Sequence, residues 1–198
     1  MKAATITELE SVLERHGTGL TPVDFIAELD AALAGLPSAG ASPLSSDEVA
    51  FLRTNAGTRA AQVLDSWDPT AESRRDADAA IGRLARDASA SMSVAQAATT
   101  LGVDRSRISH RLAQGTLWAF AMGRALRVPR WQFTAEGSLL PGLPVIVAAI
   151  PEGLAPPIIE AFMRAPLLEL GGAAPVDHLA AGGSPIPVAQ FLAALGEW

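Results

Sequence analysis

Arginine side chains are concentrated in one stretch of an otherwise acidic sequence. The 198 residues carry a net charge of −6, yet residues 92–133 contain six arginines and a single aspartate, a net charge of +5. Residues 1–91 carry −6 and residues 134–198 carry −5. Guanidinium groups donate paired hydrogen bonds to phosphate oxygens and to guanine. A basic segment between acidic flanks therefore indicates a nucleic-acid surface that the flanks do not share.

Seven polar side chains of this segment are candidate contacts to double-stranded DNA. An arginine near the start of a helix can donate two parallel hydrogen bonds to O6 and N7 of guanine, and serine or histidine can reach base edges or phosphates. Arginines on a β-hairpin can reach the backbone or the minor groove. The candidates are Arg105, Ser106, Arg107, Ser109, His110, Arg124 and Arg127.

Catalysis is not indicated by the remaining reactive side chains. The absence of cysteine excludes disulfides and thiolate metal ligands. The chain contains neither G-x-S-x-G nor G-x-x-x-x-G-K-[ST], and no carboxylate pair has a spacing that suits a shared site. Asp177 precedes His178, but we expect this aspartate to cap a short helix or to form a hydrogen bond within it. We therefore expect no enzyme, no catalytic residues, no metal and no cofactor.

The elements that must position the basic side chains follow from the local pattern. Ser93 is an N-cap residue, and a helix ending before Gly102 places Val94, Ala97, Ala98 and Leu101 on one face. Asp104 is expected to cap a second helix over 105–114, with Ile108 and Leu112 facing inward. Two apolar runs around the turn at 122–124 then predict a β-hairpin that ends at Pro129. Helix, tight turn, helix and hairpin make a winged helix-turn-helix.

Residues 93–133 resemble the excisionase/MerR-type DNA-binding domain. The shared features are an alanine-rich first helix, the sequence LGV, a polar and basic second helix, a Gly-x-Leu exit and a GR-x-LR-[IV]-P wing. Arg111 stands where that family usually has an apolar residue, and alanines at 121 and 125 replace frequent wing cations. This departure implies weak binding by one copy and dependence on a dimer. The DNA contacts that the resemblance implies are Arg105, Ser106, Ser109, His110, Arg124 and Arg127.

The N-terminal part, residues 1–90, is predicted to be helical and amphipathic. Helices are expected at 5–16, from Pro22 to about 36, from 46 to about 56, at 58–66 and from 70 to about 88. Expected N-caps are Thr21, Ser45 or Ser46, and Thr70. This part carries no recognisable chemistry, so we interpret it as a helical domain and a candidate dimerisation unit.

The C-terminal part, residues 135–198, is predicted to form short helices that cover one another poorly. Prolines interrupt its most apolar run at 139–157, so no continuous membrane-spanning helix is expected. Its layout resembles the toxin-binding domain of Xre/MbcA/ParS-type antitoxins, through PLLELGG, PVDHL, a glycine pair and a last helix over 186–195. The DNA-binding part usual in that family is a different helix-turn-helix. The resemblance implies a RES-type toxin as partner and contacts from Asp177, His178, Phe191, Glu197 and Trp198.

Together these patterns predict a mainly α protein with three domains, 1–90, 91–134 and 135–198. The reading that unites them is a cytoplasmic, homodimeric DNA-binding antitoxin that binds a toxin and represses its own transcription, with no membrane partner. A transcription regulator whose C-terminal domain dimerises or senses a ligand is the alternative. An adaptor that binds proteins through a helix-turn-helix and no DNA is a third hypothesis.

Overall fold

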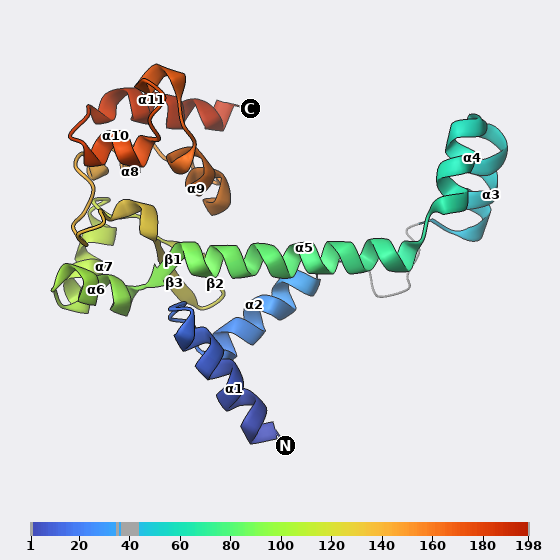
Figure 1. Ribbon diagram of the computed structural model, residues 1–198, viewed down its shortest axis with the longest axis horizontal. Coiled ribbons are helices and arrows are strands. Elements are labelled where there is room, and N and C mark those ends of the chain that lie inside the picture. The colour runs from blue at the N-terminus through green and yellow to red at the C-terminus, as the bar shows by residue number, and fades with distance from the viewer. Residues whose placement is uncertain (1, 35, 37–43, 198) are drawn as a thin grey trace. The chain divides into compact units, whose positions relative to one another are not determined.

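A computed structural model describes residues 2–34, 36 and 44–197, and these residues are mainly helical with one small antiparallel sheet (Figure 1). This confirms the predicted fold class. The α-helices are α1 (Lys2–Arg15), α2 (Pro22–Ala34), α3 (Ser46–Asn55), α4 (Gly57–Ser66), α5 (Pro69–Ala90), α6 (Val94–Leu101), α7 (Arg105–Ala113), α8 (Leu143–Ala148), α9 (Pro156–Arg164), α10 (Pro175–Ala180) and α11 (Pro185–Ala194). The strands are β1 (Ser91–Ser93), β2 (Phe120–Met122) and β3 (Ala125–Pro129), and the 3-10 turns are η1 (Arg130–Gln132), η2 (Leu168–Leu170) and η3 (Leu195–Glu197).

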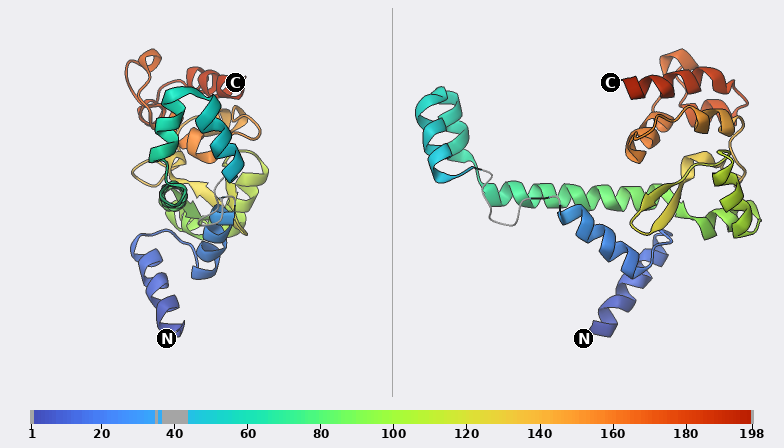
Figure 2. Two further views of the ribbon diagram at one scale, coloured as in Figure 1. Left: turned by 90° about the vertical axis from the view of Figure 1, so that its right-hand side faces the viewer. Right: turned by 180° about the vertical axis from the view of Figure 1, so that it is seen from behind.

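The chain forms two compact units whose limits differ from the three predicted domains. Residues 1–25 and 86–198 make the larger unit, and residues 26–85 make the smaller one. The continuous helix α5 contributes to both (Figures 1 and 2). The predicted DNA-binding and C-terminal parts therefore share one unit, which the first 25 residues complete.

One apolar core joins the helix-turn-helix to the C-terminal helices. Its members include fully buried side chains from α6 to α11, so the two parts cover each other's apolar faces. The C-terminal helices are short, and this shared core explains how they are held without a core of their own. The largest of its fully buried apolar side chains are Trp131, Ile108, Leu117, Leu143, Ile146, Ile159, Met163, Leu179 and Leu192.

The helix starts follow the predicted caps at two places and depart from them at a third. The Thr21 hydroxyl accepts the Asp24 N–H at 3.2 Å, and Ser45 forms a reciprocal capping box with Glu48. The backbone and hydroxyl of Ser45 both donate to the Glu48 carboxylate, which lowers the pKa of Glu48. Thr70 was expected to cap α5, and this is wrong: Pro69 occupies the first turn, and the Asp68 carboxylate accepts the N–H of Thr70 at 2.9 Å.

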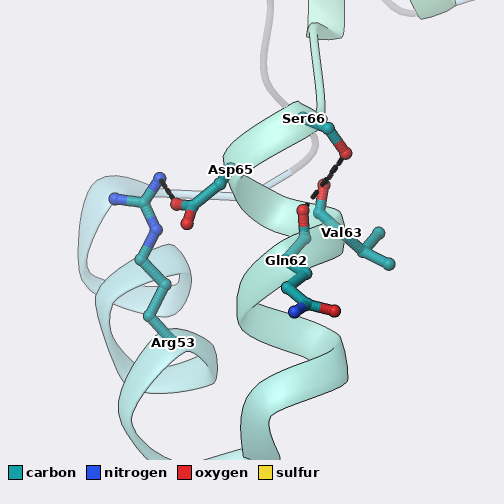
Figure 3. A network of polar contacts seen from close by, with 5 residues as sticks. All are labelled: Arg53, Gln62, Val63, Asp65 and Ser66. Carbon is teal, nitrogen blue, oxygen red and sulfur yellow. Dashed lines mark hydrogen bonds and ion pairs between the residues drawn. The ribbon is translucent and has the colours of Figure 1, made fainter.

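Helices α3 and α4 of the smaller unit form a hairpin held by polar contacts at its surface. Arg53 and Asp65 pair at 3.1 Å, and both side chains are at least half exposed. The Ser66 hydroxyl donates to the carbonyls of Gln62 and Val63, and these contacts are drawn in Figure 3. No described side chain of α3 or α4 is buried. Its apolar side chains Val49, Leu52 and Leu64 are only half-buried, so the hairpin has no fully buried core of its own among the described residues.

Proline begins each C-terminal helix, and a glycine pair separates α10 from α11. The short helices expected in PPIIEAFMRAP, from Pro175 and over 186–195 appear as α9, α10 and α11, each with proline at its start. Helix α8 lies in the proline-rich run and was not predicted. Gly183 lies directly under the His178 ring, where a Cβ atom would collide with the imidazole. Nε2 of His178 is 3.2 Å from the Ser184 carbonyl. This ring therefore braces the turn between α10 and α11.

Candidate nucleic-acid interface

Helices α6 and α7 form the predicted helix-turn-helix, and glycine ends both of them. Ser93 caps α6, as predicted. Its hydroxyl accepts the Gln96 N–H, and its own N–H donates to the Gln96 side chain, which makes a reciprocal capping box. Gly102 has φ +63° and Gly115 has φ +65°, so each adopts the left-handed conformation that a Schellman ending requires. Asp104 stands at the N-cap of α7, but its side chain makes no capping hydrogen bond. The expectation that this carboxylate caps the helix is therefore wrong.

Helix α7 presents one apolar and one polar face. Ile108 is fully buried and Leu112 is half-buried, so the helix packs on α6 and on the shared core with these side chains facing inward, as the spacing predicts. The Ser109 hydroxyl donates to the Arg105 carbonyl at 3.3 Å, so this serine is partly occupied within the helix. The side chains exposed on the remaining surface of α7 are Arg105, Ser106, Arg107, Ser109 and His110.

The wing, the hairpin β2–β3, is extended by a strand that the sequence did not predict. Strand β1 pairs with β3 antiparallel, so the sheet order is β1-β3-β2. Gly123 adopts φ +56° in the turn, and Arg124 beside it is exposed. The Gln132 side chain accepts the Trp118 N–H at 2.8 Å and donates to its carbonyl at 2.7 Å. This buried amide fixes the base of the wing.

Arg127 was predicted to contact DNA, and its position contradicts this. The side chain is fully buried, because alternation along β3 turns it toward the end of α5 and the α1–α2 loop rather than outward. Its Nε donates to the Ser91 hydroxyl at 3.1 Å, and Nη2 donates to the carbonyls of Ala88 at 3.0 Å and Ser91 at 3.1 Å. Nη2 also donates to the Thr18 carbonyl. Arg127 is thus a structural cation.

The electrostatics of Arg127 reflect this burial. Desolvation, with a smaller repulsion from Arg130, lowers the pKa of Arg127 to about 10, while Asp24 acts in the opposite direction. No described carboxylate pairs with it within ion-pair distance, and its buried Nη1 has no hydrogen-bond partner. Three carbonyls, the Ser91 hydroxyl and the more distant charge of Asp24 therefore compensate the buried charge.

Arg130 has a related role at the end of α5. It donates from Nε to the Ser89 carbonyl at 3.1 Å and from Nη2 to the Gly17 carbonyl at 2.9 Å. Together with Arg127 it caps carbonyls of the last turn of α5. Positive charge there also interacts favourably with the negative end of the helix dipole. Gln96 donates to the Gly17 carbonyl at 3.2 Å. These three side chains attach the α1–α2 loop to the helix-turn-helix.

Four of the six arginines remain for contacts outside the fold. Arg105, Arg107 and Arg124 are exposed and Arg111 is half-buried. Within the described part of the chain none of the four forms an ion pair. Their guanidinium groups are therefore free to bind anions, and the basic surface consists of α7 and the wing tip.

The predicted partner-binding residues are only partly at the surface. Asp177 is exposed, Phe191 is half-buried, and His178 is half-buried and engaged in the turn described above. Glu197 ends η3, and its side chain and Trp198 lie outside what the structure describes. Sequence reasoning did not single out Leu168, which is 90% exposed at the start of η2. Leu168 is one of three leucines in PLLELGG, and nothing in that sequence distinguishes it as the exposed one.

The described residues contain no group of three or more acidic or histidine side chains placed to hold a metal ion. Within the same residues, no helix is long and apolar enough to cross a membrane. Comparison with models of known protein families, with curated proteins and with solved structures finds no match to this chain. The assignment of a function therefore depends on the geometry of the site.

Proposed function

We propose that the protein is a sequence-specific DNA-binding regulator that inserts α7 into the major groove. The observation that carries the proposal is the exposed, unpaired cationic surface of α7 and Arg124 on a helix-turn-helix with a wing. Arg105 in the first turn of α7 is placed to read guanine, and Arg107 and Arg124 are placed to bind phosphates. The acidic remainder of the chain limits indiscriminate binding to DNA.

Fluorescence anisotropy with a labelled duplex from the protein's own upstream region tests this proposal. Each copy has three exposed arginines. We therefore expect a plot of the logarithm of the DNA association constant against the logarithm of the salt concentration to have a slope of about −3 per bound copy. Arg105→Ala should lower the affinity for the preferred site by about 1–3 kcal/mol and affect other sequences less. Arg83→Ala removes an equally exposed arginine from α5 and is the matched control. If Arg105→Ala and Arg107→Ala bind the duplex as tightly as wild type does, DNA binding through α7 is contradicted.

A second element of the proposal is that the C-terminal part binds a protein toxin, which would make the regulator an antitoxin. Besides the sequence resemblance, the loop that presents Leu168 supports it. Leu167 and Ala173 close this loop through an N–H to carbonyl bond of 3.1 Å, and the Gly172 N–H donates to the Leu167 carbonyl at 2.9 Å. A pre-ordered loop with an apolar tip loses little entropy on binding a partner.

Co-expression with the product of the adjacent reading frame tests the antitoxin assignment. If that product arrests growth, wild-type protein should relieve the arrest and co-purify with it. Leu168→Asp should weaken both effects, whereas Ile158→Asp, at another exposed apolar position of the same unit, should not. If wild type neither co-purifies nor restores growth, the protein is a regulator without a toxin partner, and the DNA-binding proposal is unaffected.

A further inference from the structure

The hairpin α3–α4 exposes large apolar side chains that neither of its two helices covers. Phe51 is 65% exposed and Val63 is 59% exposed, and no described side chain of the two helices is buried. Among the described residues of the whole smaller unit, only Ala80 and Leu84 of α5 are buried. Isolated helices of ten residues are marginal in water, and an exposed ion pair such as Arg53–Asp65 contributes little. Further burial is therefore needed to hold the hairpin.

The two exposed apolar side chains lie on the same side of the hairpin. Figure 3 shows Val63 and Asp65 pointing to opposite sides of α4, with Asp65 turned toward Arg53. Leu52 of α3 and Leu64 of α4 are half-buried, and we infer that they mark the contact between the two helices. Phe51 and Val63 each precede these leucines by one residue and lie about 100° to one side of the contact, whereas Arg53 and Asp65 follow them and lie about 100° to the other side. In an antiparallel hairpin these offsets place Phe51 and Val63 on one face and the ion pair on the opposite face. We call the former the Phe51–Val63 face.

The charges of the hairpin have a direction along its length. Arg53 and Asp65 neutralise each other in their ion pair, so the remaining charges set the pattern. Asp47 and Glu48 lie in the first turn of α3, so the open end of the hairpin is acidic. Arg59 lies in the first turn of α4, next to the connection at residue 56, so the closed end is basic. Two such hairpins placed antiparallel about a two-fold axis bring the basic end of each to the acidic end of the other.

We propose that the Phe51–Val63 face binds the same face of a second copy of this chain, antiparallel and two-fold symmetric. Phe51 and Val63 form the apolar centre of the interface, and Arg59 of one copy approaches Asp47 of the other at its rim. Each helix is only about 15 Å long, so the contact is smaller than that of a permanent dimer. We therefore expect a dimer that dissociates in the micromolar range. This proposal does not depend on DNA binding.

Sedimentation equilibrium of the full-length protein in the absence of DNA tests the proposal. Wild type should change from monomer to dimer with concentration. Phe51→Glu combined with Val63→Glu should abolish the dimer, while Gln62→Glu, an exposed neighbour that gains the same charge, should leave it intact. Far-ultraviolet circular dichroism establishes that each variant remains helical. A wild type that stays monomeric at all concentrations, or a dimer unaffected by the double variant, would overturn the proposal.

Charge reversal at the rim provides a second test that leaves the apolar centre unchanged. Arg59→Glu should raise the dimer dissociation constant by about tenfold, because it places like charges together at both symmetric contacts. Combining Arg59→Glu with Asp47→Arg in one chain restores opposite charges at both contacts and should recover most of the affinity. If the combined variant dimerises no better than Arg59→Glu alone, the antiparallel arrangement is wrong. DNA affinity measured separately keeps this result distinct from the regulator proposal.

Discussion

Arg124 and Arg127 are three residues apart in the wing, but their surroundings give them opposite roles. Arg124 follows Gly123 in the turn and is exposed, whereas Arg127 is fully buried and donates to three backbone carbonyls and one hydroxyl. A motif that counts both as wing cations does not distinguish them. The alternation of β3 does, since it directs residue 127 to the face that covers the end of α5.

The first prediction separates these roles. Arg127→Ala removes the buried side-chain donor to the carbonyls of Thr18, Ala88 and Ser91, so we expect a loss of about 3 kcal/mol in the free energy of unfolding and a fall in Tm of roughly 10 °C. Arg124→Ala should leave Tm unchanged and reduce the salt slope of DNA binding by about 1. Calorimetry and anisotropy measure the two effects. A reduced salt slope for folded Arg127→Ala would contradict its structural role.

The lowered pKa of Arg127 gives a second prediction. The folded state releases this proton near pH 10, but the unfolded chain retains it to higher pH. Above pH 10 the unfolded state therefore binds more protons than the folded state, and stability should rise with pH by at most about 1.4 kcal/mol per unit. The chain has no tyrosine or cysteine, so few other groups titrate there. Urea unfolding from pH 9 to 11.5 should show the rise in wild type and none in Arg127→Met. A fall in wild type would contradict the assignment.

At the scale of elements, Gly19 controls how closely the α1–α2 loop approaches α6. A Cβ atom at Gly19 would overlap the Gln96 carboxamide, which closes the α6 capping box and holds the Gly17 carbonyl. Gly102 has almost the same φ, +63° against +64°, but nothing lies within 4 Å of its Cβ position. The two glycines therefore share a backbone conformation that an L-residue would adopt only with strain, and they differ in their neighbours.

The third prediction uses this pair. Gly19→Ala and Gly102→Ala should both destabilise the protein through positive φ, and Gly19→Ala should cost about 1 kcal/mol more because it displaces Gln96. In a Gln96→Ala background the extra cost of Gly19→Ala should disappear. Urea denaturation of Gly19→Ala, Gly102→Ala, Gln96→Ala and the Gly19→Ala/Gln96→Ala double variant measures the coupling between Gly19 and Gln96. An extra cost that persists without the Gln96 side chain would show that the loop contact is not its source.

The sequence allowed the helix-turn-helix and wing to be predicted because their determinants are local. Ser93, Gly102 and the turn at Gly123 act within a few residues of themselves, and apolar spacing places Ile108 inward. Strand β1 was missed because three residues carry no periodicity and its partner is distant in sequence. Arg127 was misassigned for a related reason, since its carbonyl partners come from residues 18, 88 and 91. The α8 helix was obscured by the surrounding prolines, one of which, Pro144, occupies its first turn.

At the scale of the whole molecule, burial is distributed unequally between the two units. The larger unit has a continuous core in which the side chains of Ile108, Ile146 and Leu192 are fully buried. The smaller unit has two buried apolar residues among those described, both in α5. Local opening free energy follows buried apolar contact, so the two units should open independently and at different cost.

The last prediction concerns hydrogen exchange of the full-length protein. Amides of α3 and α4 should exchange at least about 100-fold faster than those of α6, α8 and α11, because no described side chain of the hairpin is buried. If a second copy covers the Phe51–Val63 face, raising the protein concentration through the dimer range should slow exchange in α3 and α4 and leave the core helices unchanged. Mass spectrometry at two concentrations measures both effects. Uniform protection across the two units would contradict the unequal burial, and concentration-independent exchange in the hairpin would argue for a monomer whose hairpin opens freely.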